Sequence, residues 1–217
     1  IFKTLDGNKE EVMANEVSIS TYNINSEWTK PVVKEARSIQ KRFKEKLENQ
    51  FDLTEKNFVT IDGQNAKDFD DAVYAEKDQD NNFVLYVAIA NVSNFIDEGS
   101  FIDQEARKRG TSVYFVNKVI PMLPEIISND LCSLKPNETR SCLICKIRLN
   151  NKGSILEASF FEGLISSKAR LIYERVSKNF EENLFHGDQA DCLRILNEIY
   201  ELLRRVKVER GALDIEI

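Results

Sequence analysis

The chain has 217 residues, of which 42% are hydrophobic, 30% charged and 9% aromatic. This composition is typical of a globular protein and excludes disordered and collagen-like chains. The longest apolar runs, such as residues 84–90, are far shorter than the ~20 residues of a membrane span, so no membrane association is expected. The net charge of −6 gives no general attraction to nucleic acid, although a cluster of acids at a metal site would produce the same figure.

The sequence lacks two features that bear on the location of the protein and on its cofactors: a signal peptide and a glycine-rich phosphate-binding loop. The first residues, IFKTLDGNKEE, have acids where a signal peptide has its apolar core, and the four cysteines suit a reducing compartment. A cytoplasmic protein is therefore expected. The sequence shows no glycine-rich phosphate-binding loop, which disfavours a nucleotide-dependent motor. No small-molecule cofactor is expected.

The N-terminal residues 1–28 contain short apolar stretches broken by Asp6, Gly7 and several asparagines. This pattern predicts strands at the end of a small β domain. Residues 29–56 are predicted to be a linker helix, because Pro31 suits a first turn and apolar residues then recur at spacings of three and four. The helix is rich in Lys and Arg, which leaves two interpretations open: a solvated face or a contact with RNA.

From residue 57 onward, β-rich apolar runs predict strands at 58–61, 72–75 and 83–90. A short helix is expected to end at Gly110, and residues 143–149 and 154–161 are expected to pair as a hairpin. Asp188 is predicted to cap a long final helix. The predicted fold class is α+β.

The segment VTIDGQNAKDFDDAV, residues 59–73, carries the most informative chemistry. It places four aspartates, Asp62, Asp68, Asp70 and Asp71, within ten residues. Like carboxylates at such spacing repel one another unless they reach into water or bind a divalent cation, for which Mg²⁺ selects oxygen ligands. The spacing alone leaves both a solvated acidic loop and a metal site open.

The string TIDGQNAKDFDDAV resembles the signature of the ribonuclease II/ribonuclease R family of exoribonucleases. The similarity continues through GTSVYF and VIPMLPE and covers roughly residues 57–176. It implies the first half of an RNB-type catalytic domain at residues 57–217, with a twisted, mostly antiparallel sheet and flanking helices. Residues 1–28 would then be the remnant of an OB or cold-shock-type RNA-binding domain.

The resemblance also implies an activity and the roles of particular residues. It predicts a metal-dependent 3′-to-5′ exoribonuclease that hydrolyses single-stranded RNA to nucleoside 5′-monophosphates, with Mg²⁺ or Mn²⁺ as cofactor. Asp62, Asp68 and Asp71 match the metal-holding positions, and Asp70 matches the position most sensitive for cleavage. Tyr114, in GTSVYF, matches an aromatic residue near the terminal nucleotides. Separately from the resemblance, Arg109 belongs to a basic cluster, residues 107–109, at a helix end, where it either compensates the helix dipole or contacts a phosphate.

Two departures qualify this resemblance. Asn91 and Asn94 stand where many relatives carry Asp and His. The family's catalytic domain also continues past residue 217, so the chain is interpreted as a fragment that is expected to be inactive alone. A non-catalytic RNA-binding module of the same fold is the alternative, although a retired site has no physical reason to keep four mutually repelling acids.

Overall fold

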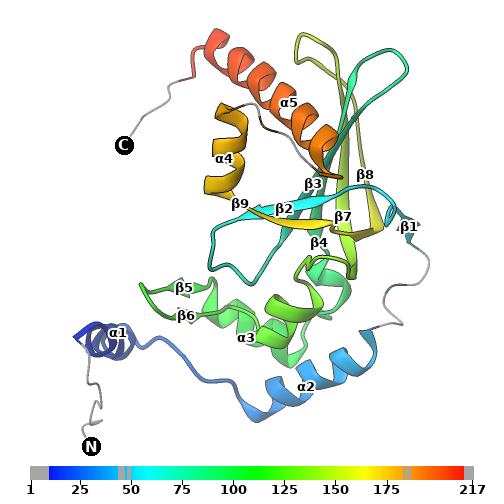
Figure 1. The fold of residues 1–217 in the computed structure, drawn as a ribbon. Coiled ribbons are helices and arrows are strands. Elements are labelled where there is room, and N and C mark those ends of the chain that lie inside the picture. Colours follow the sequence, from blue (N-terminus) through cyan, green and yellow to red (C-terminus); the bar gives the residue numbers. More distant parts are fainter. Residues whose placement is uncertain (1–9, 44–46, 48–49, 183, 185–186, 213–217) are drawn as a thin grey trace, which may run out of the picture. The chain divides into compact units, whose positions relative to one another are not determined.

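The structure is a computed structural model that describes residues 10–43, 47, 50–182, 184 and 187–212 (Figure 1). The chain divides into two compact units. Unit 1 comprises residues 1–43 and 92–131, and unit 2 comprises residues 44–91 and 132–217. No helix among the described residues combines the length and apolar character needed to cross a membrane.

Unit 1 is mainly helical. Its elements are α1 (Glu10–Thr21), α2 (Lys30–Lys41), a 3₁₀ turn η2 (Val92–Asn94), α3 (Phe101–Arg109), the short strands β5 (Val113–Tyr114) and β6 (Val119–Ile120), and a π-helical turn η3 (Ile127–Leu131). The buried side chains of α2 are Val32, Ala36 and Ile39, and α2 packs against α3. A stacked pair, Phe43 and Phe95, has its ring centroids 5.6 Å apart.

The strands predicted for residues 1–28 are wrong where the structure describes this segment. Residues 10–21 form α1, and residues 1–9 lie outside the described residues. Glu, Met and Ala in this segment are good helix formers, and the acids at its start favour a helix N-terminus. The assignment of residues 1–28 to an OB-type domain stays a prediction. The segment predicted as a linker helix, residues 29–56, contains α2, but α2 ends at Lys41 and residues 51–52 form strand β1, so a helix over the whole range is wrong. The role of this segment as a linker stays a prediction.

Unit 2 is built on a seven-stranded sheet with the order β1-β8-β7-β4-β3-β2-β9. The strands are β1 (Phe51–Asp52), β2 (Val59–Asp62), β3 (Asp71–Lys77), β4 (Phe83–Ala90), β7 (Thr139–Leu149), β8 (Ile155–Ser166) and β9 (Ala169–Ile172). Among the strands that the structure describes, only the outer pairs, β1 with β8 and β2 with β9, are parallel. The mostly antiparallel sheet and the hairpin of β7 and β8 are therefore confirmed.

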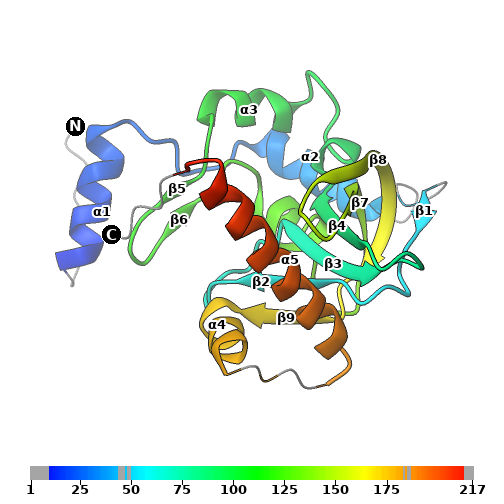
Figure 2. The ribbon, with the colours of Figure 1, turned by 90° about the horizontal axis from the view of Figure 1, so that it is seen from above.

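The helices of unit 2 are α4 (Tyr173–Glu181) and α5 (Ala190–Glu209). Figure 2 shows α5 crossing over β3. The contact buries Ile199 and Leu202 of α5 against Ala75, Phe83 and Leu149 of the sheet. The predicted cap of this helix is off by one residue, because the N-cap residue is Gln189 rather than Asp188.

Candidate active site

The four aspartates of residues 62–71 lie at one end of the sheet of unit 2. Asp62 is the last residue of β2 and Asp71 is the first residue of β3. The two strands are antiparallel, with Val59 paired to Val73, so their connection carries Asp68 and Asp70 between the two strand ends. The connection between two neighbouring strands therefore brings all four aspartates to the same end of the sheet.

Hydrogen bonds from Ser133, Leu134 and Ala90 fix the later part of the connection between β2 and β3. The Ser133 hydroxyl accepts a hydrogen bond from the Phe69 N–H at 3.2 Å and donates one to the Lys67 carbonyl at 2.8 Å. The Leu134 N–H donates to the Phe69 carbonyl at 2.8 Å, and the Ala90 N–H donates to the Asp70 carbonyl at 2.8 Å. Phe69 is buried, whereas its neighbours Asp68 and Asp70 are exposed. The buried ring thus anchors the segment and directs both acids to solvent.

Arg170 of β9 holds the other part of the connection. Its guanidinium donates hydrogen bonds to the carbonyl oxygens of Gly63 and Gln64, at 2.9 and 2.6 Å. The guanidinium carbon also lies 5.4 Å from the centroid of the Phe69 ring. Arg170 therefore orients the backbone directly after Asp62 and contributes a positive charge beside the acids.

The electrostatics show that the carboxylates interact. Burial raises the pKa of Asp62, the charges of Asp71 and Asp70 raise it further, and Arg170 opposes this rise. Burial also raises the pKa of Asp71, with the neighbouring Asp70 as the next cause. Both acids are therefore harder to ionise than an isolated aspartate, because they are partly buried and lie close to other negative charges.

The donor set fits a divalent cation. The Oδ2 atom of Asp62 is buried and receives no hydrogen bond from the described residues. Buried carboxylate oxygens normally have a partner, so this oxygen is available to bind a cation. Carboxylate oxygens are the ligands that Mg²⁺ and Mn²⁺ prefer. Within the part of the chain that the structure describes, no three metal-binding side chains converge tightly enough to enclose an ion.

Tyr114 lies in unit 1, on β5, where it pairs with Val119 of β6. Its side chain is 68% exposed. An exposed ring of this kind can stack on a base, and its exposure excludes a half-buried core position.

Arg109 does not have the exposure that a phosphate contact needs. Its side chain is only 6% exposed and forms an ion pair with the buried Glu105 at 3.0 Å. The Nη1 and Nη2 atoms donate one hydrogen bond each, to the carbonyl oxygens of Pro121 and Glu27, and the guanidinium carbon lies 3.6 Å from the centroid of the Trp28 ring. These contacts give Arg109 a structural role within unit 1, and its contact with RNA stays a prediction.

Two positioning residues were not predicted from the sequence. Ser133 stands in the apolar run LCSL and is buried in the structure. The one signal in the sequence is a polar residue within an apolar run, because a buried hydroxyl requires a polar partner. Arg170 lies in an ordinary strand, and nothing in its local pattern distinguishes it. Their partners are distant in sequence, so local analysis has no access to them.

Comparison with known proteins agrees with this architecture. The profile of the RNB domain matches residues 50–217. Ribonuclease R of Escherichia coli (strain K12) is 37% identical over the whole chain, and ribonuclease R of Thermotoga maritima is 42% identical over 88% of it. The chain spans 27% and 28% of the lengths of these relatives.

A solved structure, Mycoplasma genitalium RNase R in complex with ribose-methylated single-stranded RNA, superposes with a TM-score of 0.87 at 31% identity. The match covers 97% of this chain and 34% of that one. The sequence profile, the relatives and the fold agree with one another, and the chain belongs to the RNB-domain family.

Proposed function

We propose that the protein containing this chain is a divalent-metal-dependent exoribonuclease that hydrolyses single-stranded RNA from its 3′ end and releases nucleoside 5′-monophosphates. The observation that carries this proposal is the group of four interacting aspartates with an orphaned buried oxygen on Asp62. The relatives named ribonuclease R support the substrate class. The chain's four cysteines are free in the structure, which supports a location in the reducing cytoplasm.

Asp62, Asp68 and Asp71 are the residues that would hold Mg²⁺ or Mn²⁺. Such ions, when bound, supply the activation of water and the stabilisation of the leaving oxygen in phosphodiester hydrolysis. The protein supplies the geometry: Ser133 and Arg170 fix the backbone from which the acids project. Burial, and then the neighbouring aspartates, raise the pKa of Asp62 and Asp71, and a bound cation would offset both effects.

Asp70 is proposed to be the residue on which cleavage depends most. Its backbone is fixed by the hydrogen bond to Ala90, and its side chain is exposed. A carboxylate held in this way can accept a hydrogen bond from a water molecule and orient it. Tyr114 is proposed to stack on a base of the substrate, a contact worth ~1–3 kcal/mol that does not depend on sequence.

The test is hydrolysis of a labelled, unstructured RNA by the protein at its natural length. We expect degradation with Mg²⁺ or Mn²⁺, no degradation in excess chelator, and nucleoside 5′-monophosphates as products. Full activity in chelator would contradict the metal-dependent mechanism. RNA binding without hydrolysis under every metal condition would instead assign the protein to the alternative, a non-catalytic RNA-binding module.

A further inference from the structure

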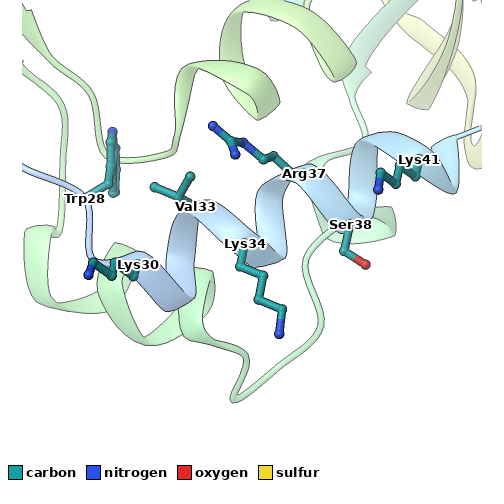
Figure 3. Close-up of a pocket in the computed structure, with 7 residues that line it drawn as sticks. All are labelled: Trp28, Lys30, Val33, Lys34, Arg37, Ser38 and Lys41. Carbon is teal, nitrogen blue, oxygen red and sulfur yellow. The ribbon is translucent and has the colours of Figure 1, made fainter.

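Helix α2 of unit 1 carries a row of cationic side chains that have no role in the aspartate site described above. A groove of about 580 Å³ runs along this helix (Figure 3). Among the residues that line it are four cations, Lys30, Lys34, Arg37 and Lys41, together with Trp28. Among the described residues, no acid lines the groove. Such a surface is unusual in a chain whose net charge is −6.

The four cations are not neutralised by the described part of the protein. None of them has an ion pair or hydrogen bond with a described side chain, and all four are exposed. The single acid of α2, Glu35, accepts a hydrogen bond from the Ile102 N–H at 2.9 Å and is thereby occupied with α3. Lys30 and Lys34, like Arg37 and Lys41, are four residues apart on one helix, where like charges repel.

The start of α2 adds to the positive potential. The first turn has no acidic residue, and the N-cap residue Thr29 makes no capping hydrogen bond through its side chain within the described structure. Lys30 therefore lies beside the partial positive charge of the helix N-terminus, an arrangement that is unfavourable unless an anion is near.

Trp28 gives the groove an aromatic wall. The indole ring is held by the Arg109 guanidinium, 3.6 Å from its centroid, which is the same contact that removes Arg109 from the solvent. Grooves that hold single-stranded nucleic acid without sequence preference combine cations for the backbone with aromatic rings for the bases. An acidic protein segment would use the cations alone.

We propose that this groove on α2 binds the phosphodiester backbone of single-stranded RNA. The proposal rests on the proposed function for the identity of its ligand, and it uses residues other than the four aspartates. The contact is electrostatic and independent of sequence, so it holds substrate without selecting it.

The experiment compares two double variants of the protein at its natural length. K34Q/R37Q removes two charges from the groove, and R175Q/R204Q removes two exposed arginines from α4 and α5 as the matched control. Lysine, arginine and glutamine have similar helix propensities, so the helices should be retained, as circular dichroism can check. Binding of a fluorescein-labelled oligouridylate is measured by anisotropy in chelator, where the proposed hydrolysis is absent.

The logarithm of the association constant falls as the logarithm of the salt concentration rises, with a slope of about −0.7 per neutralised phosphate for single strands. Loss of two contacts in K34Q/R37Q should therefore make the slope shallower by about 1.4. The ratio of the Kd at about 200 mM salt to the Kd at about 50 mM should then fall roughly sevenfold relative to wild type. R175Q/R204Q should keep the wild-type slope. Other RNA-binding surfaces contribute equally to every protein in the comparison.

An unchanged slope in K34Q/R37Q, or an equal decrease in both double variants, would overturn the proposal. If a poly-glutamate peptide binds the wild type more tightly than RNA and loses this binding in K34Q/R37Q, the groove belongs to an acidic protein partner instead. Hydrolysis is scored separately. If RNA binding shows the predicted difference in slope between wild type and K34Q/R37Q but the wild type never cleaves RNA, the proposed function is overturned and the groove assignment stands.

Discussion

The side-chain hydroxyl of Ser133 accepts a hydrogen bond from the backbone N–H of Phe69, 3.2 Å away, although 64 residues separate the two in sequence. The same hydroxyl donates to the Lys67 carbonyl. One buried side chain therefore satisfies two backbone groups on the segment that carries Asp68 and Asp70. The position of the acids depends on a residue with no charge of its own.

Replacement of Ser133 by alanine should weaken metal binding. S133A leaves a buried N–H and a carbonyl without their partner, a loss of about 1–3 kcal/mol in stability, and it releases the backbone from Lys67 to Phe69. We expect a lower Mn²⁺ affinity, measured as a smaller metal-induced rise in the thermal unfolding midpoint.

The matched control for S133A is S141A. Ser141 of β7 is also buried, and its hydroxyl donates a hydrogen bond to Gln50 at 2.8 Å. S141A should lose stability and keep the full metal-induced rise. Equal metal responses in S133A and wild type would contradict the positioning role of Ser133.

The Glu76 carboxylate should make the stability of unit 2 sensitive to acid. Burial raises the pKa of Glu76, but hydrogen bonds from Lys56 and Tyr74, with others, outweigh burial and hold it below its ordinary value of 4.5. A depressed pKa contributes stability that is complete above the ordinary value and is lost as the pH falls through the lower, folded-state value.

The thermal unfolding midpoint of the wild type should therefore decrease as the pH is lowered below 4.5. The midpoint of E76Q should depend less on pH over the same range. E157Q, at an exposed position of β8, is the control and should follow the wild type. If E76Q and wild type lose stability in parallel below pH 4.5, the contribution of Glu76 is refuted.

Three of the four cysteines should resist alkylation in the folded protein. Burial raises the pKa of Cys132 and Cys142 to about 12 and that of Cys192 to about 11. The reactive thiolate is therefore scarce at neutral pH. Peptide mapping after iodoacetamide treatment should show these three cysteines modified only in denaturant, with the half-buried Cys145 as the comparison. Modification of all four at equal rates without denaturant would contradict the structure.

The strands of unit 2 could be predicted because their apolar runs are long and bounded by turns, as at β4 and in the β7–β8 hairpin. The short apolar stretches of residues 10–21 carry no such boundary, and short runs do not distinguish helix from strand. The resemblance of the aspartate signature identified the candidate site. The hydrogen bond between Arg109 and Glu27, across 82 residues, and that between Arg170 and Gly63, across 107, depend on tertiary structure that no local pattern contains.

The most direct test of the central claim is the turnover of labelled single-stranded RNA by D70N, measured beside its RNA affinity in the protein at its natural length. Asparagine preserves the shape of the side chain and removes one negative charge. We expect turnover to fall by at least about 10²-fold, as for the loss of a preorganised electrostatic group, while the Kd for RNA stays equal or becomes slightly tighter.

D188N, an equivalent change at an exposed position ahead of α5, should cleave at the wild-type rate. Near wild-type turnover by D70N, with Mg²⁺ or Mn²⁺ present, would show that the reaction centre is not at these aspartates.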